Sequence, residues 1–121
     1  MEGAVPGVLR RLALDGATLL AARRDDAVVG FALCAPNPRV LELFYLAVDA
    51  VSWGDGVGAA LLAAVDDHAR TEGYDEIELW VIDDNTRATG VYRRAGWVPT
   101  DDVVADPTSG RDERRFTRRL T

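Results

Sequence analysis

The chain has 121 residues, 48% of them hydrophobic, and a formal net charge of −6 from 14 basic and 20 acidic side chains. This length fits one small domain, residues 1–121, with enough apolar residues for a core that needs no metal. The negative balance argues against nucleic acid as the main partner, because phosphate contacts need a basic surface, and it suits a cationic substrate.

The cysteine and histidine content and the lengths of the apolar runs argue against disulfide-linked, metal-binding and membrane-spanning proteins. Cys34 is the single cysteine, so an internal disulfide is impossible, and the apolar run "VVGFALCA" predicts a buried thiol. With His68 as the only histidine, a His/Cys metal site is not expected, and we predict no metal cofactor. No apolar run approaches the roughly 18 residues of a membrane span, and no signal-peptide pattern is present. We therefore expect a cytoplasmic protein without membrane contact.

The first half of the chain predicts a helix and three strands. In residues 5–14 the apolar positions recur with helical spacing, and Gly16 offers a stop. Two strand-like runs, 17–23 and 27–35, flank a charged turn and predict a hairpin. The segment 39–49, "RVLELFYLAVD", is nearly all apolar and predicts a central strand.

The second half alternates helices and strands. Residues 56–71 predict a helix, 76–83 a strand with an apolar side, and 86–95 a second helix. Further strands are expected near 97–104 and 114–120. The order β–α–β–α–β indicates an α/β (α+β) fold with a partly parallel sheet covered by helices.

The stretch "WGDGVGAALL", residues 53–62, has glycines at alternate positions between a predicted strand end and a predicted helix start. A helix N-terminus has free backbone N–H groups and a partial positive charge, and glycine lets a ligand approach closely. The loop is therefore a candidate pyrophosphate cradle. A nucleotide P-loop is excluded because Ala59-Ala60, and no lysine, follow Gly58. A dinucleotide fingerprint would space its glycines differently. A glycine-rich turn without a ligand stays open.

Two segments together carry a resemblance to a known family. "LELFYLAVDAVSWGDGVGAALL" resembles the acetyl-CoA-binding segment of the GNAT superfamily of N-acetyltransferases, and "NTRATGVYRRAGW" resembles its Asn-x-x-Ala-x-x-Leu/Val-Tyr-x-x-x-Gly-Phe segment. The resemblance covers roughly residues 17–120 and implies a mixed central sheet flanked by helices, with a shortened N-terminal part. The matching positions are Trp53, Gly56, Gly58, Leu61, Leu62, Asn85, Ala88, Val91, Tyr92, Gly96 and Trp97. Trp53 departs from the pattern, which has Arg or Gln there.

The resemblance implies direct transfer of an acetyl group from acetyl-CoA to an amine, without a metal. Amides of the glycine loop are then expected to hold the pyrophosphate, and the strand backbone to pair with the peptide-like pantetheine arm where neighbouring strands splay apart. Asn85 fits a pantetheine contact, although a helix N-cap is an equally sound role. The expected donor-binding residues are Leu46, Ala47, Val48, Trp53, Gly54, Asp55, Gly56, Val57, Gly58, Ala59, Asn85 and Tyr92.

The expected proton acceptor is Glu42, the only charge in "VLELFYLAV". By strict alternation it shares a face with Phe44 and Leu46. Some members of the resembled family place a base glutamate at this position. The alternative is a strand-end carboxylate that faces solvent or an arginine, and Asp83 and Asp84 are second choices as the base.

Tyr92 occupies the position of the resembled family's usual general acid, and the alternative is a packed helix tyrosine. Arg87, Arg93 and Arg94 are candidates for the 3′-phosphate of CoA, although a solvated basic helix face is the simpler interpretation.

The expected partners are acetyl-CoA and an unidentified amine. The amine is expected to be cationic, because a cluster of acidic residues would attract it. The cluster comprises Asp83, Asp84, Asp101 and Asp102. Only residues 1–16 precede the predicted hairpin, so we expect an open acceptor side and a homodimer that covers it. A non-catalytic acyl-CoA-binding module on the same fold is the alternative function.

Overall fold

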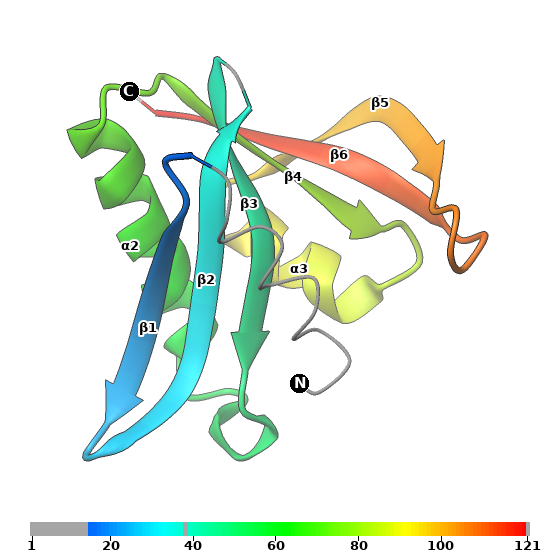
Figure 1. Ribbon diagram of the computed structural model, residues 1–121. Coiled ribbons are helices and arrows are strands. Elements are labelled where there is room, and N and C mark those ends of the chain that lie inside the picture. Colours follow the sequence, from blue (N-terminus) through cyan, green and yellow to red (C-terminus); the bar gives the residue numbers. More distant parts are fainter. Residues whose placement is uncertain (1–14, 38, 121) are drawn as a thin grey trace.

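The computed structural model describes residues 15–37 and 39–120. They form a six-stranded sheet with two α-helices and a short 3-10 turn (Figure 1). The spatial order of the strands is β1-β2-β3-β4-β6-β5. In chain order the elements are β1 (Thr18–Arg24), β2 (Ala27–Asn37), β3 (Val40–Val48), the 3-10 turn η2 (Ala50–Ser52), α2 (Val57–Thr71), β4 (Glu76–Ile82), α3 (Thr86–Arg94), β5 (Val98–Ala105) and β6 (Asp112–Arg119).

The mixed sheet confirms the predicted fold class. β3 and β4 are parallel and joined through α2, whereas the other pairs are antiparallel. β3 is an interior strand, as its apolar sequence predicts. All predicted elements after residue 16 are present close to their predicted bounds, and η2 is an addition to them. The helix predicted over 5–14 lies outside the described residues.

Helix α2 begins directly after the glycine loop. Gly56 precedes it in a left-handed backbone conformation with φ of 84°, which residues with a Cβ rarely adopt. The apolar positions Val57, Leu61, Leu62 and Val65 form one stripe that is buried against the sheet. A helix of 15 residues gains most of its stability from packing such a stripe, so tertiary contacts fix where α2 starts and how it lies.

A β-bulge bends β3 in its middle. Leu33 of β2 lies opposite Tyr45, and the next residue, Cys34, lies opposite Leu43, so Phe44 is the extra residue of β3. A bulge increases the local twist and turns the strand. Beyond Leu43, β3 therefore leaves its parallel neighbour β4.

Both helices cover the same face of the sheet (Figure 1). The hydrophobic core lies between them and the strands, and it includes Leu41 and Leu43 of β3, Leu79 of β4 and Phe116 of β6. Because side chains alternate along a strand, Glu42 points to the opposite face. The sheet thus separates an apolar helix side from a side that carries charge.

Candidate functional site

Strands β3 and β4 diverge in the middle of the sheet. Their parallel ladder consists of three residue pairs, the last being Leu43 with Leu79, although β3 continues to Val48 and β4 to Ile82. β3 stays paired with β2, and β4 with β6, along the diverging parts. The opening therefore lies between two intact halves of the sheet (Figure 1), as the splay implied by the family resemblance predicts.

Backbone groups of β3 face this opening. The N–H of Asp49 donates to the Val29 carbonyl at 2.7 Å, so the backbone groups of Asp49 point toward β2. Since the direction alternates along a strand, the N–H and C=O of Leu46 and Val48 point to the side from which β4 has diverged. One of these groups is occupied, because the Trp53 Nε1–H donates to the Val48 carbonyl at 2.9 Å.

Two expectations about β3 need correction. Ala47 lies opposite Phe31 in the β2–β3 register, and its backbone groups point toward β2 rather than into the opening. Strict alternation predicts Leu46 on the face of Glu42, and this is wrong. The bulge at Phe44 shifts the alternation, so that Leu46 packs against the core on the helix side.

The glycine loop presents a row of backbone N–H groups. The amides of Trp53 and Asp55 are used within the loop, where each donates at 3.2 Å, to the carbonyls of Ala50 and Ser52 respectively. Five amides of the predicted cradle donate to no acceptor in the described part of the chain: those of Gly54, Gly56, Val57, Gly58 and Ala59. Unsatisfied amides at a helix start attract an anion, so five of the seven expected amides are suited to that task.

Trp53 stands at the head of the loop with its side chain half exposed. The guanidinium carbon of Arg87, in the first turn of α3, lies 3.8 Å from the centroid of the indole ring, a cation–π contact. Asp55 forms an ion pair with Arg24 at 3.0 Å. The carboxylate inside the loop is therefore neutralised, while an arginine from another helix lies against its first residue.

Three elements meet around Gly58. A Cβ atom at this position would lie 3.9 Å from Val48 Cγ2 at the end of β3, and 4.0 Å from Val91 Cγ1 on α3. The start of α2, the end of β3 and the middle of α3 thus converge within contact distance. A ligand on the loop amides would lie next to the opening between β3 and β4.

Asn85 caps helix α3. Its Oδ1 accepts a hydrogen bond from the Ala88 N–H at 3.1 Å, which confirms the N-cap interpretation. The carbonyl oxygen of the side chain is thereby used, and the amide Nδ2 keeps two donor hydrogens for another partner.

Tyr92 packs on the helix side at the point where the strands part. Its ring centroid lies 6.0 Å from that of Trp97 and 6.3 Å from that of Phe116. Phe116 lies opposite Leu79, the last β4 residue paired with β3. Burial raises the pKa of Tyr92 to about 12, because a low-dielectric environment disfavours the phenolate. The phenol therefore stays protonated throughout the neutral range.

Glu42 lies one residue before the same point, on the opposite face. It pairs with Glu78 in the β3–β4 ladder, and each residue is only 8% exposed. Asn37 Nδ2 donates to Glu42 Oε1 at 2.6 Å and to Glu78 Oε1 at 3.4 Å. Arg115 Nε donates to Glu78 Oε2 at 2.6 Å. The alternative of a solvent-facing Glu42 is therefore wrong, and Arg115 binds the neighbouring Glu78.

Sequence reasoning missed Asn37, Glu78 and Arg115. One signal for Glu78 was available, because Ile77 and Leu79 alternate as buried residues and leave the glutamate between them on the other face. Asn37 lies at the end of β2 and Arg115 in the middle of β6, and no local pattern links them to Glu42.

The second choices for the proton acceptor are held by arginines of the β5–β6 region. Asp83 accepts hydrogen bonds from Arg114 at 2.8 and 3.1 Å, and this contact holds the pKa of Asp83 below its usual value. Asp84 forms an ion pair with Arg111. A carboxylate whose pKa is lowered, as that of Asp83 is, is a weak proton acceptor. Both arginines also offset charge that would attract a cationic amine.

The remaining sequence expectations concern the thiol, metals and membranes. Cys34 is fully buried, and burial raises its pKa to about 11. Among residues 15–37 and 39–120, no group of three or more His, Cys, Asp or Glu side chains is arranged to hold a metal ion. The same part of the chain contains no helix long and apolar enough to cross a membrane.

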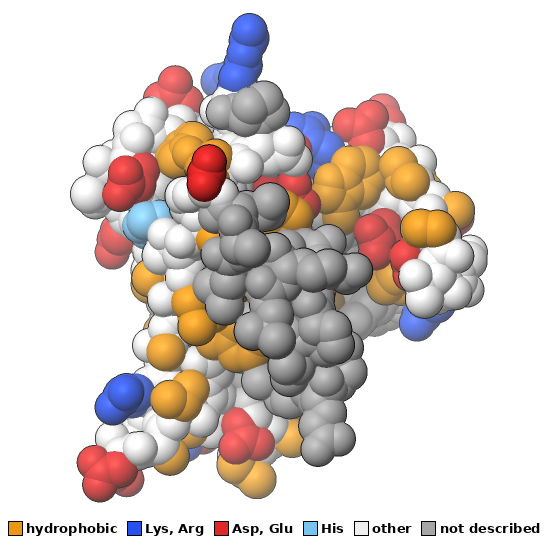
Figure 2. All heavy atoms as spheres, in the orientation of Figure 1, with side chains coloured by type: hydrophobic (Ala, Val, Ile, Leu, Met, Phe, Trp, Pro, Cys, Tyr) orange, Lys and Arg blue, Asp and Glu red, His pale blue; other side chains and the backbone are white. Residues whose placement is uncertain are grey.

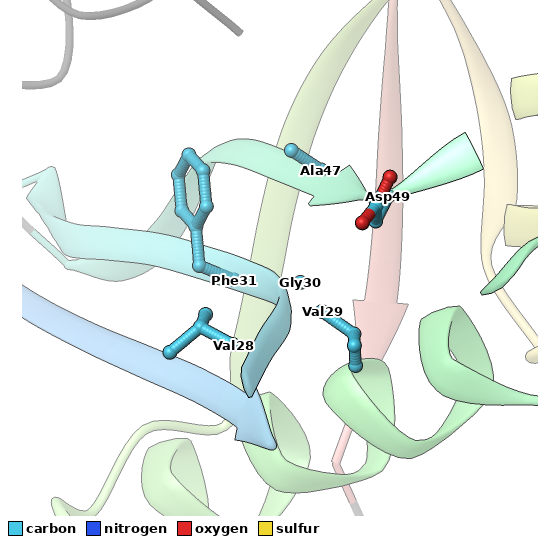
Figure 3. Close-up of a pocket in the computed structure, with 6 residues that line it drawn as sticks. All are labelled: Val28, Val29, Gly30, Phe31, Ala47 and Asp49. Carbon is cyan, nitrogen blue, oxygen red and sulfur yellow. The ribbon is translucent and has the colours of Figure 1, made fainter. Parts of the chain in front are cut away.

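A hollow of about 260 Å³ lies between the ends of β2 and β3 (Figure 3). Its lining is mainly apolar, with one carboxylate, and consists of Val28, Val29, Gly30, Phe31, Ala47 and Asp49. It shares only Ala47 with the expected donor-binding residues and does not include Glu42 or Tyr92. The hollow is therefore separate from the point at which β3 and β4 part.

Comparisons with known proteins agree with this geometry. The sequence model of the acetyltransferase (GNAT) family matches residues 6–97. A mycothiol acetyltransferase from Clavibacter sepedonicus is 40% identical over 84 residues, which are 69% of this chain and 28% of that protein. Its counterpart from Sanguibacter keddieii is 39% identical over 90 residues, 69% of this chain and 29% of that protein. The chain thus spans less than a third of the length of these relatives.

Solved structures show the same fold. A GNAT-family structure from Desulfovibrio desulfuricans superposes with a TM-score of 0.81 at 25% identity, over 99% of this chain and 79% of that one. A GNAT acetyltransferase from Elizabethkingia anophelis, solved with acetyl-CoA bound, gives 0.79 at 17% identity, over 99% of this chain and 84% of that one. With a family match over most of its length, the chain belongs to the acetyltransferase (GNAT) family, a family of acyltransferases.

Proposed function

We propose that this chain is an N-acetyltransferase that transfers the acetyl group of acetyl-CoA directly to a primary amine of a small molecule or protein. One observation carries the proposal: two proton-handling side chains flank the point where β3 and β4 part, with Tyr92 on the helix side and Glu42 on the opposite side. Family membership and the acetyl-CoA bound to the Elizabethkingia anophelis protein support acetyl-CoA as the donor.

The donor would be held mainly by backbone groups. The free amides from Gly54 to Ala59 suit the pyrophosphate. The backbone groups of Leu46 and the N–H of Val48 suit the amides of the pantetheine arm, which would pair as an added strand does. Asn85 Nδ2 is available for a further contact, since Oδ1 serves the cap. The thioester carbonyl would then lie near the divergence of the strands, where a β3 amide can polarise it.

Glu42 is proposed as the proton acceptor. An alkyl amine has a pKa near 10.4, so its neutral form costs about 4–5 kcal/mol at pH 7. In the proposed step the amine loses a proton to Glu42, directly or through water, and its nitrogen forms a bond to the carbonyl carbon. The carbon–sulfur bond then breaks and CoA leaves as a thiolate. Asn37 orients the Glu42 carboxylate through a hydrogen bond of 2.6 Å, and this neutral amide stabilises the ionised form less than the arginine that binds Asp83.

Tyr92 is proposed to stabilise the departing thiolate by a hydrogen bond. With the pKa of Tyr92 at about 12, full proton transfer to a thiolate whose acid has a pKa near 8.5 is uphill by about 5 kcal/mol. Donation of a hydrogen bond needs no such transfer. The proton that finally reaches CoA would then come from solvent or from the amine.

The acceptor is proposed to be a cationic amine, because two buried carboxylates, those of Glu42 and Glu78, lie on the acceptor side. The name mycothiol acetyltransferase belongs to relatives of whose length this chain matches less than a third, so their acceptor is not transferred to this chain. The cytoplasmic location remains a prediction from composition. The same holds for the expectation that the chain binds neither nucleic acid nor a membrane.

Release of free CoA thiol in the presence of acetyl-CoA and a panel of amines tests this proposal. The expected result is turnover with at least one primary amine, and none when Glu42 and Tyr92 are both replaced, as Glu42→Gln and Tyr92→Phe. Binding of acetyl-CoA without turnover on any amine would instead favour a non-catalytic acyl-CoA-binding module. One observation favours that second function: Trp53 already occupies the Val48 carbonyl, one of the backbone groups that face the opening.

We also propose a homodimer. The edge strand β5 exposes Val98, Val103 and Val104 by 61%, 40% and 56%, and Figure 2 shows hydrophobic side chains on this part of the surface. Exposed valines on an edge strand favour pairing with another chain, and a twofold dimer is the commonest arrangement. Sedimentation equilibrium at micromolar concentration should show a dimer that Val104→Asp dissociates. A monomer at every concentration would contradict the proposal.

A further inference from the structure

The contact between Trp53 and Arg87 links the glycine loop to helix α3. Trp53 is fixed at two places, since its Nε1–H binds the Val48 carbonyl and its ring carries the Arg87 guanidinium at 3.8 Å. An arginine stacked on an aromatic face keeps its N–H groups in the plane of the guanidinium, where they remain available as donors. Arg87 is thus held beside the loop with its hydrogen-bonding edge unused by the indole.

The ion pairs around the loop leave Arg87 without a carboxylate. Asp55, the acidic residue of the loop, is paired with Arg24 at 3.0 Å. Among the described residues, no Asp or Glu oxygen lies within 4.0 Å of the Arg87 guanidinium, although the chain has 20 acidic residues and 14 arginines. An exposed cation beside five unsatisfied amides fits an anionic ligand.

We infer that Arg87, oriented by Trp53, supplies the cationic contact to the diphosphate of the donor. The inference rests on the proposed function, because it assumes that CoA binds at the glycine loop. The loop position that carries Arg or Gln in the resembled family carries Trp53 here. A side chain from the neighbouring helix therefore takes over the charge, and the tryptophan acts as a positioning residue for it.

Isothermal titration with CoA on the full chain tests this assignment. Arg87→Ala should weaken binding about tenfold, the size of one charge-assisted hydrogen bond. The matched control is Arg119→Ala, which removes the same charge from an exposed position on β6 opposite the start of β4. It should change the Kd by less than about twofold. Equal affinities of the two variants, with unchanged thermal unfolding midpoints, would overturn the inference.

Dephospho-CoA separates the diphosphate from the 3′-phosphate. If Arg87 binds the diphosphate, Arg87→Ala should lose the same factor with dephospho-CoA as with CoA. A loss that disappears with dephospho-CoA would overturn the assignment to the diphosphate. Weakened binding of pantetheine, which has no phosphate, would overturn it as well.

Two further variants test the part played by Trp53. Trp53→Leu should weaken CoA binding, and adding Arg87→Ala should cost little more, because the two residues act as one unit. Trp53→Arg in the Arg87→Ala background should restore affinity by returning a cation to the loop. Additive losses would overturn the positioning role of Trp53. Absence of CoA binding by the unmodified chain at millimolar concentration would instead refute the proposed function itself.

Discussion

The two sides of the opening between β3 and β4 are built differently. On the donor side, the candidate groups lie in two short segments, 46–59 and 85–92, and most of them are backbone amides and carbonyls. On the acceptor side, the carboxylates of Glu42 and Glu78 are held by side chains from the end of β2 and from β6. The donor side depends on the course of the backbone, and the acceptor side on contacts between distant strands.

This difference determines how each side can be damaged. Backbone donors survive most substitutions, so the donor side fails when a side chain fills the space of the ligand. The acceptor side fails when a charge or a hydrogen-bonding group is removed, because buried carboxylates need their partners. Donor binding should therefore be sensitive to the size of a substituted side chain, and the acceptor side to the loss of a charge or a hydrogen-bonding group.

Gly58→Arg should break the donor side completely. The new side chain starts between Val48 and Val91, where a Cβ is accommodated at 3.9 and 4.0 Å but a long side chain must extend into the ligand space. We expect no detectable binding of acetyl-CoA by titration. Gly58→Ala is the matched control and should bind within about threefold of the unmodified chain, because its Cβ makes ordinary contacts only. Binding by the arginine variant would show that the donor lies elsewhere.

Glu42→Gln should damage the acceptor side without affecting the donor. The expected loss of kcat is about 10³-fold at pH 7, within the range of general-base effects, and much smaller at pH 9.5 where neutral amine is more abundant. Steady-state rates across this pH range, with the Kd of acetyl-CoA measured in parallel, provide the check. An equal loss at both pH values would contradict a role as proton acceptor.

Tyr92→Phe sharpens the comparison because Tyr92 lies in the donor segment but is proposed to act in the chemical step. It should lower kcat by roughly 10²-fold with little change in KM for acetyl-CoA, since the aromatic packing against Trp97 and Phe116 is kept. The measurement is a thiol-release assay at saturating amine. An unchanged kcat would mean that the thiolate leaves without help from the phenol.

The smallest expected effect concerns stability at alkaline pH. The pKa of Tyr92 is raised from 10 to about 12 in the folded chain, so the neutral phenol favours the folded state below pH 10 and this contribution is lost as the pH rises toward 12. The contribution is about 2–3 kcal/mol at most. Urea unfolding between pH 8 and 11.5 should show a steeper decline for the unmodified chain than for Tyr92→Phe. Parallel declines would contradict the raised pKa.

The residues proposed for the donor side could be chosen from the sequence because they follow one another along the chain. The glycines, Asn85 and Tyr92 could be assigned from two local patterns, and the alternation of helices and strands gave the mixed sheet. Trp53 was found as a departure from the pattern, but its contact with Arg87 depends on how α3 packs against the loop. Local sequence patterns indicate secondary structure, but they do not indicate how a helix packs against a distant loop.

The acceptor side was only partly predictable. Glu42 stood out as a lone charge in an apolar strand, but its pairing with Glu78 depends on the register of β3 and β4. The bulge at Phe44 places Leu46 on the face opposite to the expected one, and it results from the pairing of β3 with β2. The apolar sequence of β3 contains no residue pattern that indicates a bulge. Contacts that depend on strand register and bulges cannot be predicted from a local sequence pattern.

A crystal structure of the chain with CoA tests the central claim most directly. We predict that the diphosphate lies within hydrogen-bond distance of the amides from Gly54 to Ala59 and that the pantetheine arm lies beside Leu46 and Val48. The sulfur should lie between Tyr92 and the sheet face that carries Glu42. CoA bound in the hollow between β2 and β3, or a sulfur remote from both Tyr92 and Glu42, would contradict it.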